Sequence, residues 1–184
     1  TEFGTLLYHY EGVNPGATFF PAAEQISEKE ILQKAAEILR QRAKGKVLKT
    51  PKAAKDLALH HCSAMEQCGS GLILLGADFQ VLDLVDVTLG TTDACDLSPR
   101  EVVKAALSAN ATGVFVYVNT LNQKPTFSEE DGEFANMLRA ALALMDIRLL
   151  DILKTGTGGC LSMREESAKR AEQEAKKASV AKAS

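Results

Sequence analysis

The stretch Val116–Asp131, VYVNTLNQKPTFSEED, predicts a strand that leads through a loop into a helix. It continues the β-branched and aromatic run Val114–Val118, a composition typical of a buried strand. A polar loop with Pro125 follows, and Ser128 then precedes the three acids Glu129–Asp131. Serine caps a helix N-terminus and acids stabilise the first turn, so a helix is expected from about residue 128. Such junctions often hold metal or active sites, which makes this stretch the first place to look for chemistry.

Three further helix starts precede this junction. Ser27 with Glu30 forms a capping-box pattern, and the pairs Thr50–Pro51 and Ser98–Pro99 place a capping residue before a proline. Gly45 is the expected end of the first helix. That helix carries an apolar stripe at helical spacing, made of Ile31, Leu32, Ala35, Ile38 and Leu39.

Two strand pairs complete the pattern. Residues 71–90 predict two strands joined by a turn at Gly76–Asp78, and residues 147–163 predict a second pair. The segment Gly156–Gly159 could suggest a phosphate loop, but no Lys-Ser/Thr pair or helix pattern follows it, so it predicts a hairpin turn. The order helix, helix, hairpin, helix, strand, helix, hairpin predicts one mixed α/β domain of two or three layers.

This domain is expected to span residues 27–163. Residues 1–26 mix turn formers with aromatic residues and predict an irregular arm, which either folds over its own domain or binds a partner; we expect the former. Residues 164–184 are rich in Ala, Lys and Glu and predict a polar tail, helical or disordered.

Composition favours a globular protein. The chain has 184 residues, 46% of them hydrophobic, and a formal net charge of −3, which gives no overall attraction to nucleic acid. No apolar run approaches the length of a membrane span and no signal-peptide pattern opens the sequence, so we expect a cytoplasmic protein without a membrane partner. Its four cysteines form no CxxC pair, which argues against a zinc ribbon and for free thiols.

Three strings of this sequence resemble the RadC-like branch of the JAB/MPN metalloprotease superfamily. They are LSPREVVKAALSANATGVFVYVN at 97–119, KPTFSEED at 124–131 and LRAALALMDIRLLDILKTGTGGCLSMRE at 138–165. The resemblance extends from about Ile26 to Glu165. It implies a cytidine-deaminase-like JAB/MPN fold, in which helices flank a mixed, twisted sheet.

The resemblance also implies a chemistry. In this superfamily two histidines and an aspartate bind zinc, a glutamate accepts a proton from the zinc-bound water, and a serine helps bind the oxyanion. Only the serine and the aspartate, Ser128 and Asp131, are present here. The other motif positions carry different residues. Val118 and Thr120 stand at the positions of the two histidines, and Leu121 stands at the position of the proline after them. Cys68 stands at the position of the glutamate, with Glu66 two residues earlier, and Ile152 stands at the position of a further histidine.

One carboxylate does not hold zinc against water, because zinc sites use three or four protein ligands. We therefore expect no metal and no other cofactor, and no hydrolase activity. Ser128 and Asp131 then have a structural role, as cap and first-turn acid of a helix. On that basis Asp131→Ala is expected to lower stability by about 1 kcal/mol or less.

The leading hypothesis is a metal-free JAB/MPN-like pseudoenzyme that binds another protein, such as a second JAB/MPN module, and forms a homodimer. The resemblance also carries a historical label of DNA repair, which no residue here supports by itself. An alternative is a metal-dependent peptide or isopeptide hydrolase with an unusual ligand set: Cys68, Asp131 and either Cys95 or Asp96.

Another alternative is a nucleic-acid-associated accessory protein, for example on a mobile element. Its support is a local basic cluster, although we expect that cluster to be a solvated connector. A metal site at His60–Cys62 is not expected, because adjacent helical residues point in different directions. The basic cluster consists of Lys44, Lys46, Lys49, Lys52 and Lys55.

Overall fold

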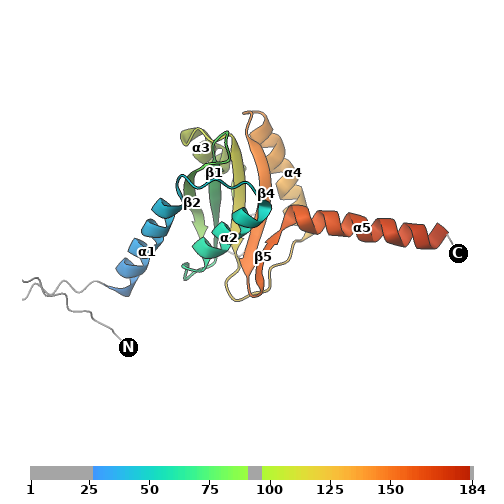
Figure 1. Ribbon diagram of the computed structural model, residues 1–184, viewed down its shortest axis with the longest axis horizontal. Helices are drawn as coiled ribbons and strands as arrows, with labels where there is room; N and C mark the ends of the chain where they lie inside the picture. Colours follow the sequence, from blue (N-terminus) through green and yellow to red (C-terminus); the bar gives the residue numbers. More distant parts are fainter. Residues whose placement is uncertain (1–26, 91–96, 183–184) are drawn as a thin grey trace, which may run out of the picture.

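The expected helices and strands form in the order that the sequence predicts (Figure 1). The computed structural model describes residues 27–90 and 97–182, so the arm 1–26, Cys95 and Asp96 lie outside the described residues. Within these ranges the elements are α1 (Glu28–Ala43), α2 (Pro51–Cys62), β1 (Gly69–Leu75), β2 (Val81–Leu89), α3 (Pro99–Ser108), β3 (Gly113–Asn119), α4 (Glu129–Ala143), β4 (Arg148–Gly156), β5 (Gly159–Ser162) and α5 (Met163–Lys182).

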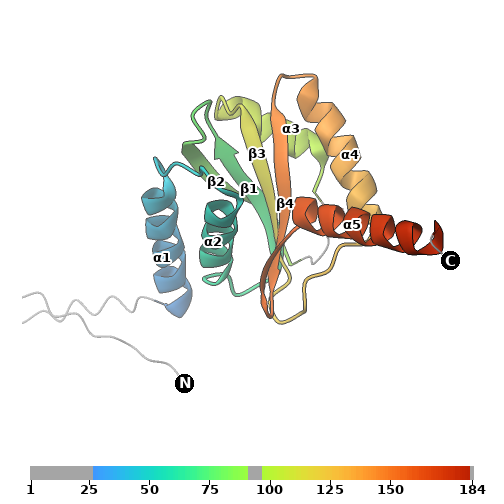
Figure 2. The same cartoon turned by 45° about the vertical axis from the view of Figure 1, so that its right-hand side comes forward.

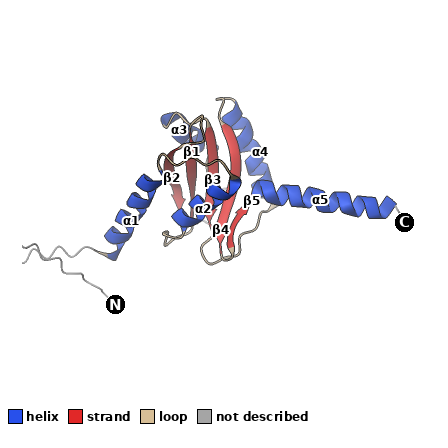
Figure 3. Ribbon diagram, viewed as in Figure 1, coloured by secondary structure: helices blue, strands red, loops and turns tan. Residues whose placement is uncertain are grey.

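The strands form one five-stranded sheet in the order β2-β1-β3-β4-β5 (Figure 3). β1 pairs antiparallel with both β2 and β3, β3 and β4 are parallel, and β5 returns antiparallel to β4. The parallel pair is connected through α4, which follows the junction at Ser128. The predicted fold class, a mixed sheet flanked by helices, is confirmed.

The two faces of the sheet carry separate hydrophobic cores, because side chains alternate along each strand. On β3, Val114, Val116 and Val118 pack beneath α3 and α4. Tyr117, one residue from Val118, points to the opposite face, where α2 and the end of α1 lie. Figure 2 shows α1 and α2 on one side of the sheet, and α3 and α4 on the other.

The predicted caps are largely confirmed. Ser27 and Glu30 form a capping box at the start of α1, and Ser128 and Asp131 form another at the start of α4. Ser98 is the exception, since its side chain makes no capping hydrogen bond, although α3 still begins at the following proline. The Gly156–Gly159 segment is confirmed as the turn between β4 and β5.

The apolar stripe of α1 is only partly covered by the rest of the domain. Ile31 is 49% exposed and Ile38 is 45% exposed, whereas Leu39 is half-buried and Ala43 is buried at the end of the helix. The reason is geometric: α1 extends beyond the sheet, so only its last turns reach the core (Figure 1). The pattern predicted which side of the helix is apolar, but not what covers that side.

α5 extends away from the domain in both views (Figures 1 and 2). Its beginning is fastened by an ion pair between Glu165 and Lys55, 2.8 Å long, and by a hydrogen bond from Arg170 to the carbonyl of Phe127. From Ser167 to Lys177 every residue is exposed. In the described part of the chain, none of the helices has the length and apolarity needed to span a membrane.

Candidate functional site

Two side chains stand at the positions of the zinc-binding histidines. One points into the hydrophobic core, and the other already forms hydrogen bonds within the protein. Val118, in β3, is 0% exposed and belongs to the core beneath α3 and α4. Thr120 follows β3, and its hydroxyl donates to the carbonyls of Thr155, at 2.8 Å, and Gln123, at 3.1 Å. A valine has no lone pair, and this threonine hydroxyl is used in fixing the loop.

Asp131 is held by two different groups. Its Oδ2 accepts hydrogen bonds from the backbone N–H of Ser128, at 2.8 Å, and from the Ser128 hydroxyl, at 3.1 Å. The same oxygen accepts from Nζ of Lys154 at 2.7 Å, and both side chains of this ion pair are almost fully buried. Lys154 also lies over the ring of Phe127, 5.4 Å from the centroid. The buried carboxylate therefore has a cation beside it, supplied by the protein itself.

The register between β3 and β4 places Lys154 beside Asp131 at the start of α4. It lies in β4 directly beside Val118 of β3, so a residue of β4 faces the same α4 terminus as the expected ligand position. The sequence analysis did not identify Lys154 as part of the site. A lysine following the apolar residues Ile152 and Leu153 within a strand was the available signal, because charged residues are seldom buried without a partner.

The remaining motif positions do not supply a zinc site. Cys68 is half-buried directly before β1, and its carbonyl accepts from the backbone N–H of Gly90. Glu66 is exposed in the loop before it, and Ile152 is 1% exposed in the core. Among residues 27–90 and 97–182, no three His, Cys, Asp or Glu side chains come together as a metal site.

The described residues at this junction therefore do not fit zinc, which requires three or four protein ligands. The hydrolase alternative with Cys95 or Asp96 stays a prediction, because both residues lie outside the described ranges.

The His60–Cys62 cluster diverges as expected from a helix. His60 is exposed, His61 points to Asp86, and Cys62 packs into the core. Burial raises the pKa of the Cys62 thiol to about 12, so it stays protonated at neutral pH. Burial does the same to Cys160, whose pKa is raised to about 12. Neither thiol is therefore a nucleophilic thiolate at neutral pH.

A second polar cluster, which the sequence analysis missed, joins α1 and α2 to the sheet. Oδ1 of Asp86, in β2, forms a hydrogen bond with Nε2 of His61, at 2.7 Å, and accepts another from the hydroxyl of Tyr117. Its Oδ2 accepts from Arg40 of α1 at 2.6 Å. Gly71 leaves the room that this cluster needs, since a Cβ there would lie 2.3 Å from the Tyr117 hydroxyl.

Charge and hydrogen bonding set the protonation of this cluster. Burial alone raises the pKa of Asp86, but hydrogen bonds from His61 and Tyr117 and the nearby charge of Arg40 outweigh it and lower the pKa to about 2. Burial, and then the negative charge of Asp86, raises the pKa of Tyr117 well above its ordinary value. The cluster thus holds an ionised carboxylate and a protonated phenol.

The predicted basic cluster is partly neutralised. Lys44 pairs with Asp83 at 3.2 Å, and Lys55 pairs with Glu165 at 2.8 Å. The other three lysines, Lys46, Lys49 and Lys52, are exposed. Binding to nucleic acid at this place stays a prediction.

Comparison with known proteins supports the resemblance inferred from the strings around the junction. The family model of the RadC-like JAB domain matches residues 48–168. A UPF0758 protein of Vibrio cholerae is 34% identical over 154 residues, which cover 83% of this chain and 98% of that protein. Another UPF0758 protein of Vibrio cholerae is 30% identical over 135 residues, which cover 73% of this chain and 85% of that protein.

Some similar proteins are longer. A UPF0758 protein of Aeromonas salmonicida is 33% identical over 122 residues, which cover 66% of this chain and 54% of that protein. The chain thus spans nearly all of one relative and about half of another.

Proposed function

Since this chain belongs to the family of RadC-like JAB domains, we propose that it is a member that acts by binding another protein and performs no zinc-dependent hydrolysis. The single observation that carries this proposal is the buried ion pair between Asp131 and Lys154, 2.7 Å long. The residue expected to bind zinc has its negative charge balanced by an ammonium group of the same chain.

The physical argument concerns charge. A divalent ion bound to Asp131 would lie next to the Lys154 ammonium in a buried site, where repulsion between cations is strong. Displacing Lys154 would leave its charge buried without a partner. Two further ligands are also needed, and Val118 and Thr120 do not provide them. Without a metal, a water at this place keeps its high pKa and is not a nucleophile at neutral pH.

Elemental analysis of purified protein tests this proposal. We expect no stoichiometric zinc in the wild type. Stoichiometric zinc is expected when both histidines are introduced and the internal cation is removed, in the variant Val118→His, Thr120→His, Lys154→Met. The matched control keeps Lys154 beside the two histidines and should bind much less zinc. Adding Cys68→Glu would restore the presumed base.

Near-equimolar zinc in the wild type, lost on Asp131→Ala or Cys68→Ala, would contradict the proposal. The hydrolase with a different ligand set would then be favoured. Ile152 occupies the position of the further histidine and has no group with which to orient a zinc ligand, so even the rebuilt site is expected to bind zinc more weakly than a native one.

The proposed binding surface is the outer face of α3 and α4. Leu144 is 82% exposed there, and Leu107 and Met145 are 52% and 49% exposed. These side chains line a shallow groove of about 570 Å³, with Arg100 and Lys104 at its border. An exposed apolar face bordered by polar residues is typical of a protein-interaction site. The proposed partner is a second copy of the chain, and sedimentation across a concentration range tests the association.

A further inference from the structure

A cleft of about 460 Å³ opens beside the beginnings of α2 and α5. Its lining comes from the segment before α2, the turn between β1 and β2, the strands β3 and β4, and the start of α5. Next to it, the ion pair between Lys55 and Glu165, 2.8 Å long, connects the two helices. The cleft shares no lining residue with the α3/α4 groove. Its volume is that of an ordinary small-molecule site.

The apolar part of the lining contains two phenylalanine rings. Phe115 of β3 and Leu150 of β4 are half-buried and pack against the core beneath α2. Phe79 lines the same cleft and is 40% exposed. The guanidinium of Arg148 lies 5.9 Å from the centroid of the Phe79 ring. Two aromatic rings that the protein covers only in part offer a flat apolar group a surface on which to stack.

The backbone of Phe79 has a conformation that is unfavourable for this residue type. Its φ is +60°, in the left-handed region that glycine adopts without cost and that a large side chain seldom adopts. Hydrogen bonds fix it there: its N–H donates to the carbonyl of Gly76, at 3.0 Å, and its carbonyl accepts from the N–H of Leu48, at 2.9 Å. Residues strained in this way occur preferentially at ligand sites. A ring that is both strained and 40% exposed therefore points to binding.

The two acids that line the cleft already have partners. Both carboxylate oxygens of Glu165 lie 2.8 Å from Nζ of Lys55. Asp151 accepts hydrogen bonds from the hydroxyl of Ser162 and from the backbone N–H of Arg164, the latter at 3.1 Å. Glu165 is thus balanced by a cation, and Asp151 is held at the start of α5 by neutral donors.

The two cations that line the cleft are Lys49 and Arg164. Both are exposed, and neither side chain forms an ion pair with another described residue. The lining side chains and their ion-pair partners comprise these two cations, Lys55 and the two acids, which leaves one net positive charge. A singly charged anion therefore suits the cleft better than a doubly charged phosphate, which the acids would repel. A guanidinium also matches the geometry of a carboxylate.

We propose that this cleft binds a small aromatic carboxylic acid. The aromatic group lies against Phe79 and Phe115, and Lys49 and Arg164 bind the carboxylate. The site depends neither on zinc nor on the proposed partner protein.

Fluorescence titration with indole-3-propionate tests this proposal in the full-length chain. The chain has no tryptophan, so the indole can be excited where tyrosine does not absorb and observed without a protein signal. On addition of protein, we expect the emission to move to shorter wavelength and the anisotropy to rise to saturation. Unlabelled 3-phenylpropionate should displace the probe. The neutral analogue indole-3-propanol should bind about tenfold more weakly, and 3-cyclohexylpropionate and AMP should compete less than 3-phenylpropionate.

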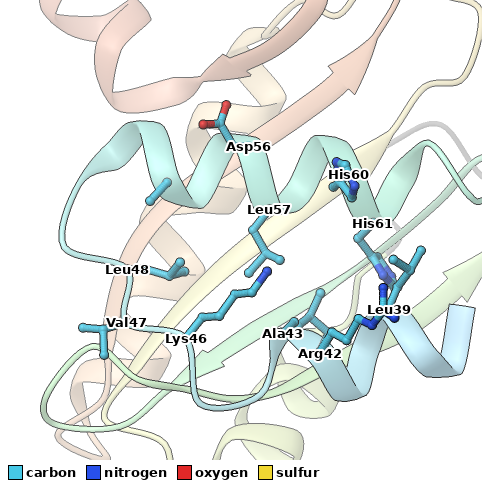
Figure 4. Close-up of a pocket in the computed structure, with 12 residues that line it drawn as sticks. Leu39, Arg42, Ala43, Lys46, Val47, Leu48, Asp56, Leu57, His60 and His61 are labelled. Carbon is cyan, nitrogen blue, oxygen red and sulfur yellow. The ribbon is translucent and has the colours of Figure 1, made fainter.

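Variants at the cleft identify the binding residues. Phe79→Gly removes the ring but relieves the backbone, so we expect a melting temperature close to that of the wild type and an affinity for the probe about tenfold lower. Lys49→Gln with Arg164→Gln should also lower the affinity about tenfold. The matched control, Arg42→Gln with Lys46→Gln, removes two exposed cations that line a different cleft, between α1, α2 and the segment that connects them (Figure 4). It should bind the probe as the wild type does.

Saturable binding that both cleft variants weaken and the control retains would support the proposal. A probe that never saturates, or an affinity that Phe79→Gly leaves unchanged, would overturn it. Equal losses in the control and in the Lys49 and Arg164 variant would also overturn it, because they would reflect overall charge only. Stronger competition by AMP than by 3-phenylpropionate would assign the cleft to a phosphate ligand instead, and equal binding of indole-3-propanol would remove the carboxylate from the proposal.

Discussion

At the residue scale, the ion pair between Asp131 and Lys154 revises the role expected for the aspartate. The sequence correctly predicted its part in the helix cap, where Ser128 and Asp131 exchange hydrogen bonds. It did not predict that the same side chain neutralises a lysine of β4, because the two residues are far apart in sequence and meet only when β4 pairs with β3. Caps are local and readable from sequence, whereas a pair that depends on strand register is not.

This ion pair increases the loss in the free energy of unfolding that we expect for Asp131→Ala. A cap alone contributes about 1 kcal/mol, but removing one partner of a buried ion pair costs about 3–5 kcal/mol because a charge is left buried alone. We expect the larger loss in the free energy of unfolding, measured by urea denaturation. The double variant Asp131→Asn, Lys154→Met removes both charges while keeping similar volumes, and should be more stable than Asp131→Ala.

Lys154→Met is the single-variant control, since it leaves the cap intact. A loss of about 1 kcal/mol or less for Asp131→Ala, with a double variant no more stable than Asp131→Ala, would restore the simpler cap interpretation.

At the element scale, the sequence predicted where each described helix and strand lies, because caps, turns and hydrophobic periodicity are local signals. It did not predict how α1 is attached. The apolar stripe indicates which side of the helix is apolar, yet Ile31 and Ile38 on that side are about half exposed. The attachment instead includes a polar contact, the Arg40–Asp86 pair, which no periodicity indicates.

The Asp86 cluster makes the attachment of α1 and α2 depend on pH. The pKa of Asp86 is lowered from 3.8 to about 2 in the folded protein. A carboxyl group with a lowered folded pKa stabilises the protein above its unfolded pKa, and this contribution is lost as the pH falls through the folded value. We therefore expect Asp86 to contribute fully above about pH 4, and progressively less toward pH 2.

Chemical denaturation at several pH values checks this expectation. Asp86→Asn should lower stability at neutral pH and flatten the decline between about pH 4 and 2. Asp78→Asn, at an exposed carboxylate in the turn between β1 and β2, is the control and should keep the wild-type slope. An unchanged slope in Asp86→Asn would mean that other acids account for the acid sensitivity.

At the scale of the whole molecule, the sheet separates two faces with different surfaces. The face with α1 and α2 carries a cleft, and the face with α3 and α4 carries the apolar groove that we propose for a partner. The cores beneath the two faces share no buried residue. Substitutions on one face are therefore expected to act independently of the other.

Measurements of self-association test whether the α3/α4 groove binds a second copy of the chain. The strands are mostly buried or half-buried, and the exposed apolar residues of the groove, Leu107, Leu144 and Met145, lie in α3 and directly after α4. We expect the chain to sediment as a dimer at micromolar concentration, and Leu144→Glu to shift it to monomer because a buried carboxylate in the groove would lack a partner. Leu59→Glu, at a 39% exposed position of α2 on the other face, is the matched control and should remain dimeric.

A monomer at every concentration would contradict self-association. A dimer that Leu59→Glu disrupts and Leu144→Glu does not would place the interface on the α1/α2 face instead.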